Sequence, residues 1–298
     1  MAKKGEKIKE KLIEYFLFAL SLASLVFLAG IVVTLFRESL PAFRDIGFFR
    51  MIAGRDWYPT YDPPDFGILP LIAGSFLVTL ISILISVPLG LAGAVYISEL
   101  AGKKEKAFLK PALELLSSIP SVVYGFWGMV FLAPFLQKHL ELSTGYCALA
   151  AGIVLGIMST PIIASLSEDA LNYVPRAFKE ASYALGANRW ETVTRVIIPS
   201  AASGIITSVI LGTGRAIGET MVVLMISGGS AILPQSFLEP VRPMTSAIAA
   251  EMGEAAFGTP HYHSLFAIAL ILFGITFVLN LAAEMIAKKF RLKLGASR

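Results

Sequence analysis

Charged residues are scarce in this chain. Only 15% of its 298 residues are Asp, Glu, Lys or Arg, whereas 56% are hydrophobic, and the mean hydropathy is +0.73. A soluble domain carries about 25% charged residues, so the shortage excludes an ordinary soluble protein and indicates a chain whose main solvent is lipid. Cysteine is nearly absent too. Cys147 is the only one, which excludes an intrachain disulfide and leaves the redox compartment open.

Several functional signatures are also missing. No GxxxxGK[ST] phosphate-binding loop occurs, so we expect a transport subunit without its own ATP site rather than an enzyme. An intramembrane enzyme acting on lipid phosphates would need a His, Asp or Cys grouping that the sequence lacks. His261 and His263 lie close together, but two histidines are too few ligands for a metal site. We therefore expect no catalytic residue, no cofactor and no metal. The sequence also lacks a basic tract interleaved with aromatic residues, so nothing in it indicates binding of nucleic acid.

Six apolar runs are long enough to cross a bilayer, which takes about 20 mostly apolar residues. The expected fold is therefore an all-α membrane protein, with a first transmembrane helix at 15–36 and a five-helix core at 68–287. Two of the core runs exceed the thickness of a bilayer, and Pro88 and Pro120 are their expected bend points because each removes a backbone donor. The six runs lie at 15–36, 68–98, 107–136, 146–166, 200–227 and 264–287.

The distribution of Lys and Arg predicts the orientation. Alternate connecting segments hold 18 basic residues in one set and 6 in the other. Because cytoplasmic loops carry the excess of Lys and Arg, we expect both termini to face the cytoplasm. The basic-rich set comprises the N-terminus 1–14, the segment 99–110, the loop 167–199 and the tail 288–298; the opposite set comprises 37–67, 137–145 and 228–263.

The 167–199 loop is expected to have secondary structure of its own. Pro175 suits a first helical turn, and helical spacing then places three apolar residues on one face: Phe178, Ala181 and Leu185. Gly186 follows as a helix stop that can take a positive φ. A second short helix is expected to carry Trp190, Val193 and Ile197 on one face. The loop is thus predicted to be a helix–turn–helix lying across the cytoplasmic surface.

Two uses of this loop are open. An amphipathic helix that lies on lipid headgroups favours a polar face rich in Lys and Arg. Here Glu180 and Glu191 are mixed with Arg189 and Arg195. That mixture favours a loop that is gripped by another protein.

The fifth apolar run contains two charged residues, Arg215 and Glu219. An Arg in a membrane span costs about 2.5–3.5 kcal/mol on insertion scales, so it normally faces a bundle interior or an aqueous path. Four residues apart on a helix, the two side chains are expected to touch. The guanidinium fork suits phosphate-like oxyanions, and Glu219 would hold that fork and partly cancel its charge. A structural ion pair between spans or subunits is the alternative, and the pair alone does not decide.

The 167–199 loop resembles the coupling loop of bacterial ABC importer permeases, which reads EAA, three residues, Gly, nine residues, Ile-x-Leu-Pro. This chain has Glu180-Ala181-Ser182, then Gly186, Val196, Ile198 and Pro199, with conservative changes at Ser182, Val196 and Ile198. In that family the short helix docks into a cleft on a separate cytoplasmic ATPase. The resemblance implies the type I ABC importer permease fold. It assigns ATPase coupling to Glu180, Ala181, Ser182, Gly186 and Pro199.

Other stretches resemble the PstC-type permeases of phosphate ABC importers, so that the likeness covers nearly the whole chain. They are FRESLPAF (36–43), the apolar run 68–100, SIPSVVYGFWG (118–128), GTGRAIGETM (212–221) and MTSAIAAEMGEA (244–255). The resemblance implies a phosphate path lined by Arg215, Glu219 and Thr220. It also implies a bacterial inner-membrane location and three partners: a PstA-like sister permease, two copies of a PstB-like ATPase and an extracytoplasmic PstS-like phosphate-binding protein. A permease for another oxyanion, such as molybdate or sulfate, stays open, whereas the 167–199 loop argues against a passive channel or scaffold.

Overall fold

The computed structural model describes residues 2–293, which are mostly helical. The first elements are α1 (Ala2–Ala42), the π-helical turn η1 (Phe43–Gly47), α2 (Phe48–Ala53) and the antiparallel pair β1 (Trp57–Tyr58) and β2 (Asp65–Phe66). Next come α3 (Leu69–Val95), η2 (Tyr96–Leu100), α4 (Lys103–Ser118), α5 (Ser121–Trp127), η3 (Gly128–Leu132), α6 (Ala133–His139) and α7 (Ala148–Asn172). The last are α8 (Arg176–Ala184), α9 (Arg189–Thr192), η4 (Val193–Ile197), α10 (Ile198–Ile217), α11 (Met221–Ile226), α12 (Met244–Glu251) and α13 (Pro260–Lys293).

Five helical segments of the described chain are long and apolar enough to cross a membrane. A sixth is present when the bent pair 103–118 and 121–139 counts as one span. The six expected spans are therefore found. The five are Lys11–Ala53, Leu69–Leu100, Ala148–Asn172, Arg189–Ile217 and Pro260–Ile286. Residues 294–298 of the expected basic tail lie outside the described residues.

The two expected bend points behave differently. α3 continues through Pro88 without interruption, because a proline inside a helix costs one backbone hydrogen bond and need not end it. At Pro120, α4 stops and the two helices on either side are bent by 86°. Ile119 before it has φ −62° and ψ 129°, the extended conformation that a following proline favours. We call residues 118–121 the elbow.

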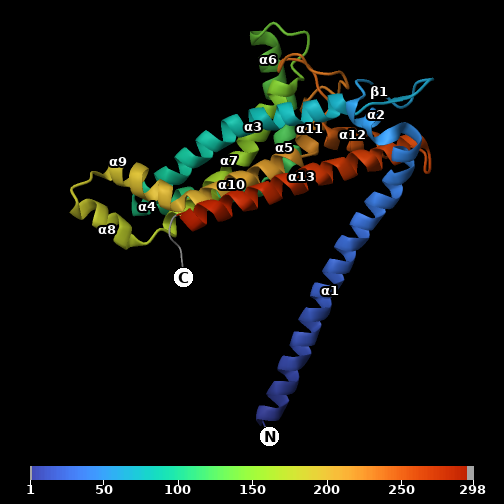
Figure 1. Cartoon of the computed structure of the whole chain (residues 1–298). Coiled ribbons are helices and arrows are strands. Elements are labelled where there is room, and N and C mark those ends of the chain that lie inside the picture. The colour runs from blue at the N-terminus through green and yellow to red at the C-terminus, as the bar shows by residue number, and fades with distance from the viewer. Residues whose placement is uncertain (1, 294–298) are drawn as a thin grey trace.

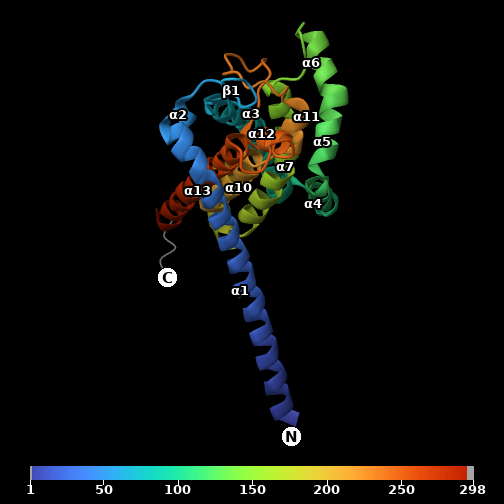
Figure 2. The same ribbon diagram turned by 90° about the vertical axis from the view of Figure 1, so that its right-hand side faces the viewer.

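Four long helices, α3, α7, α10 and α13, run alongside one another and form the bundle (Figure 1). α8 and α9 lie at one end of it, which we call the loop end, together with the start of α4. The strands, α2 and α12 lie at the opposite end (Figure 1). α1 meets α13 near Glu38 and then leaves the bundle, and all its residues from 11 to 31 are exposed (Figure 2).

Three apolar clusters hold these parts together. A central one joins α3, α6, α7 and α11, and it includes Cys147, Val154, Leu155, Val222 and Ile226. One at the loop end buries Ala94, Leu171, Val193, Ile197 and Ala201, and so seats the second half of the 167–199 loop on α3 and α7. A third, at the opposite end, is built around Met51, Trp57, Leu71, Met244 and Leu265.

Candidate functional site

The first half of the 167–199 loop is α8 followed by a tight turn at Gly186. Gly186 has φ +85°, as the sequence predicts for a helix stop. Its N–H donates to the carbonyl oxygen of Tyr183 at 2.9 Å, and the N–H of Ala187 donates to that of Ser182 at 3.2 Å. These two bonds form the Schellman motif, which satisfies the last carbonyl groups of a helix. The direction in which the loop reverses is therefore fixed by one glycine.

The second half of the loop is held to the first by side chains. The amide side chain of Asn188 caps α9 by accepting from the N–H of Glu191. The hydroxyls of Ser182 and Thr192 lie 2.9 Å apart and are buried, so they tie α8 to α9. Ser182 thus does more than replace an alanine.

The apolar face expected on the second helix is only partly correct. Val193 and Ile197 are buried, but Trp190 is 64% exposed. Trp190 lies in α9, before the π-helical turn η4, and the wider turn changes the helical phase. Its indole therefore points away from the face that Val193 and Ile197 bury.

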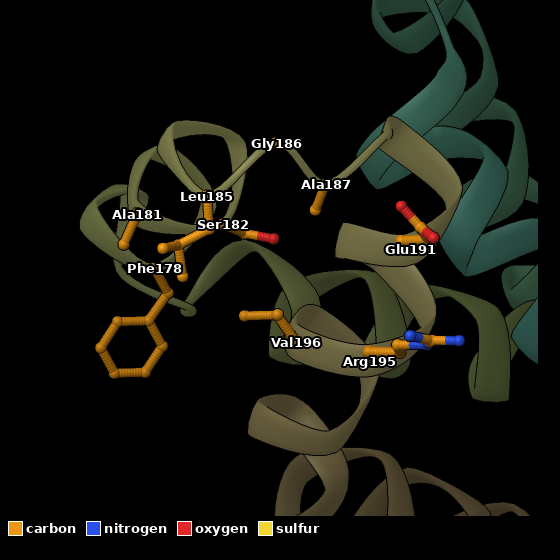
Figure 3. A pocket seen from close by; sticks show the side chains of 9 residues that line it. All are labelled: Phe178, Ala181, Ser182, Leu185, Gly186, Ala187, Glu191, Arg195 and Val196. Carbon is orange, nitrogen blue, oxygen red and sulfur yellow. The ribbon is translucent and has the colours of Figure 1, made fainter.

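A groove of about 530 Å³ lies between α8 and η4. Phe178 and Ala181 line it from α8, Leu185 lines it directly after that helix, and Val196 lies across from them (Figure 3). Phe178 is 49% exposed and Leu185 is 89% exposed, so an apolar surface is open at the tip of the molecule. A surface of this kind marks an interaction site.

The structure brings four of the five expected coupling residues together on and after α8. Glu180 and Ala181 are exposed, Ser182 is buried, and Gly186 forms the turn. The carboxylate of Glu180 has no hydrogen-bond or ion-pair partner among the residues that the structure describes. Pro199 lies apart from them, as the second residue of α10, which directly follows the π-helical turn η4.

The prediction that Arg215 and Glu219 touch is wrong. α10 ends at Ile217, so the two residues are not on one continuous helix. The carboxylate of Glu219 turns instead to α11, where it accepts from the N–H groups of Met221 at 3.0 Å and Val222 at 3.4 Å. Thr220 lies in the break, and its hydroxyl is 3.4 Å from the carbonyl oxygen of Gly218. A carboxylate at a helix N-terminus is favourable, and here it takes precedence over the ion pair.

Arg215 is consequently an unpaired cation within residues 2–293. It is exposed and continues a ridge on α10 that includes Thr207 and Leu211 at four-residue spacing, both also exposed. An uncompensated guanidinium in a membrane span marks a path or an interface. The guanidinium group of Arg215 therefore lies on an exposed face of the bundle.

The break beside Arg215 is braced by two neighbouring helices. From α12, the hydroxyl of Thr245 donates to the carbonyl oxygen of Glu219 at 2.7 Å. From α5, Gly125 approaches α11 so closely that an added Cβ would lie 2.8 Å from Sδ of Met225. α5 follows the elbow directly, so the position of the elbow decides where this helix meets α11.

A buried carboxylate at the loop end was missed by sequence reasoning. Glu168, near the end of α7, is 1% exposed and lies 2.8 Å from the ammonium groups of both Lys106 and Lys110 on α4. Lys110 also lies 2.7 Å from Asp169. The available signal was the spacing of the two lysines, four residues apart and so on one face of α4. Nothing in the linear sequence indicated which acid they meet.

At the opposite end, Glu251 is the centre of a second polar cluster. Its carboxylate accepts from the indole N–H of Trp57 at 3.1 Å, from Arg242 at 2.6 Å and from His261 at 2.9 Å. His263 lies instead against Glu38. Within the described residues no three His, Cys, Asp or Glu side chains converge as metal ligands.

Comparisons with known proteins match this chain to membrane components of transport systems. A family model described as "binding-protein-dependent transport system inner membrane component" matches residues 86–292. The probable ABC transporter permease protein YqgH of Bacillus subtilis is 37% identical over 271 residues, covering 90% of this chain and 88% of that protein. The phosphate transport system permease protein PstC of Mesorhizobium japonicum is 34% identical, covering 93% and 90%.

A solved structure of a bacterial ABC transporter involved in the import of alginate matches with a TM-score of 0.66. The match covers 94% of this chain and 98% of that chain, at 15% sequence identity. At this identity the similarity shows the fold alone.

Proposed function

This chain belongs to the binding-protein-dependent transport system inner membrane components, as a multi-pass ABC importer permease of the type I fold, and we propose that its cargo is inorganic phosphate. The observation that carries the proposal is the exposed Arg215, which no carboxylate of the described residues neutralises. Its planar fork can donate two parallel hydrogen bonds to a phosphate-like oxyanion. Glu219, turned away to cap α11, leaves that fork open. The PstC relatives named for phosphate transport support this cargo.

We propose further that the path residues are Arg215, Glu219 and Thr220, with different roles. Arg215 meets the anion directly. Glu219 and Thr220 hold the break between α10 and α11 open, so that the guanidinium sits at a helix end rather than within a packed helix. A site that binds an anion with one cation and no metal can also release it.

The 167–199 loop is the proposed docking site for a separate, PstB-like ATPase. The exposed groove between α8 and η4 supports this role, as does the exposed carboxylate of Glu180 on α8. The loop end then faces the cytoplasm of a bacterial cell, and the proposed orientation has both termini on that side of the membrane. A PstA-like sister permease pairs with this chain in the proposed importer. A PstS-like binding protein docks at the opposite end of the bundle.

The test is uptake of labelled phosphate by the complete importer in sealed vesicles, with molybdate and sulfate as competitors. Arg215→Ala should abolish uptake and leave the assembly of the subunits intact. Arg215→Lys keeps the charge but loses the fork, and it should restore only a small part of the rate. Transport of molybdate without transport of phosphate would remove the cargo assignment. An Arg215→Ala complex that does not assemble would favour a structural role for this residue.

A further inference from the structure

A series of contacts between polar side chains runs from the 167–199 loop to α4. Its first link is Glu99, in the π-helical turn η2 at the end of α3. The ammonium group of Lys179 on α8 lies 2.6 Å from the Glu99 carboxylate, which is 7% exposed. The guanidinium of Arg189 on α9 donates to the backbone carbonyl of the same residue. Both helices of the loop therefore hold on to one residue of the bundle.

The series continues from Glu99 to α7 and α4 through neutral groups. The hydroxyl of Ser98 has one proton, which it can donate either to the Glu99 carboxylate at 3.0 Å or to the side-chain oxygen of Asn172 at 3.2 Å. That oxygen also accepts from Lys106 at 3.1 Å, while the amide nitrogen of Asn172 donates to Glu168. Glu168 then binds Lys106 and Lys110.

Burial makes the last link stiff. The Glu168 side chain is 1% exposed, and an ionised carboxylate out of water requires its partners. If α4 moved away from α7 by itself, Glu168 would be left as an uncompensated buried charge. α4 and the end of α7 must therefore move together.

α4 leads through the elbow to α5, the helix that packs on α11 after the break that follows Arg215. Its last turn is tied across the elbow by the Tyr124 hydroxyl, which donates to the carbonyl oxygen of Leu116 at 3.0 Å. The next residue, Gly125, is the close contact of α5 with α11. A displacement of α4 at the loop end would therefore shift α5 against α11, the helix that follows the break after Arg215.

We propose that Glu99 and Glu168 are the positioning residues through which movement of the 167–199 loop reaches the elbow. This inference rests on the proposed docking of an ATPase at that loop, but not on the identity of the cargo. Glu99 passes the displacement from α8 and α9 to η2, and Glu168 passes it to α4. Neither carboxylate touches the solute.

The test measures the distance across the elbow in the complete importer. Spin labels are attached to cysteines at Phe108 on α4, 73% exposed, and Phe131 in η3, 62% exposed. The native Cys147 is 0% exposed and stays unlabelled. The label distance should change between the nucleotide-free complex and one that holds ATP on a hydrolysis-deficient ATPase. Glu99→Lys should suppress that change, and Lys179→Glu added to it should restore the change because the ion pair is re-formed with reversed signs.

Glu168→Gln is the second variant, and Lys104→Gln is the control. Lys104 lies exposed on the same helix and has no ion-pair partner among the described residues. Glu168→Gln should reduce the phosphate carried per ATP hydrolysed by about fivefold, the lower end of typical coupling between sites. Stimulation of ATP hydrolysis by the binding protein should persist, since docking is untouched. Lys104→Gln should leave both unchanged.

Two results would overturn the proposal: an elbow that does not respond to nucleotide in the wild type, and a full response in Glu99→Lys or Glu168→Gln. A failure of the proposed cargo looks different. The wild-type elbow would then respond to nucleotide, and the variants would suppress that response, while labelled phosphate stayed outside the vesicles.

Discussion

The turn at Gly186 offers the sharpest test of how the 167–199 loop works. Replacing Gly186 by Val places a β-branched residue at φ +85°. A left-handed conformation costs an ordinary L-residue about 1–2 kcal/mol. The added Cβ would meet no other atom within 4 Å, so the cost worked out here is that of the backbone conformation.

The size of the effect has an upper limit. If the turn opens to relieve the strain, it gives up two backbone hydrogen bonds, each worth about 1 kcal/mol. The native loop is therefore destabilised by about 2 kcal/mol at most. Through the population of loops in the docking conformation, this lowers the apparent affinity for the ATPase by a factor of about 30.

The assay is a titration of the purified ATPase subunit onto the permease pair in lipid nanodiscs, with ATP hydrolysis stimulated by the binding protein as the signal. Gly186→Val should shift the half-saturating ATPase concentration upward by about 5- to 30-fold. Gly186→Asn is the matched control, because Asn tolerates a positive φ, and it should stay close to wild type. Wild-type hydrolysis and uptake in the Val variant would contradict the reasoning. Equal damage by Asn and Val would show that the backbone conformation is not the cause.

Three further changes test single contacts. Ser182→Ala removes one buried hydrogen bond within the loop and should lower stability by about 0.5–1.5 kcal/mol, seen as a small decrease in the unfolding temperature of the complex; an unchanged temperature would show that the bond contributes nothing. Trp57→Phe deletes a donor to the Glu251 carboxylate and should cost about 1.5–3 kcal/mol by the same measurement, whereas a loss below that of Ser182→Ala would contradict the central place of Glu251. Tyr124→Phe removes the bond to the Leu116 carbonyl across the elbow, worth about 1 kcal/mol, so exchange of the amide hydrogens of residues 119 and 121–123 should become about fivefold faster; unaltered exchange would show that Tyr124 does not brace the elbow.

Much of the fold could be predicted because membrane spans are set by composition and length. The six apolar runs all correspond to helices, and the positive φ of Gly186 followed from its place after a periodic face. The choice between the two prolines did not follow. Both Pro88 and Pro120 lie in apolar runs, yet only Pro120 is preceded by a residue that leaves the helical conformation. That difference depends on tertiary packing, which a single sequence does not display.

The candidate site was predicted in its residues but not in its contacts. Arg215 and Glu219 were expected to touch because a continuous helix was assumed through residue 227. The break after Ile217 turns Glu219 toward amide groups that no pattern of side chains reveals. Glu168 was missed for a related reason: its two partners lie about 60 residues earlier in the chain, and long-range ion pairs leave no periodic signal. The sequence predicts which residues belong to the candidate site, but it does not predict which side chains on different helices pair with one another.

The isolation of α1 has a consequence for how the protein is made. Residues 11–31 touch no core cluster, and the helix Lys11–Ala53 that contains them is long and apolar enough to cross a membrane. A helix whose backbone groups are all bonded internally is stable in hydrocarbon by itself. α1 can therefore enter the bilayer as soon as it leaves the ribosome. It then tethers the nascent chain to the membrane while the helices that will form the bundle are still being translated.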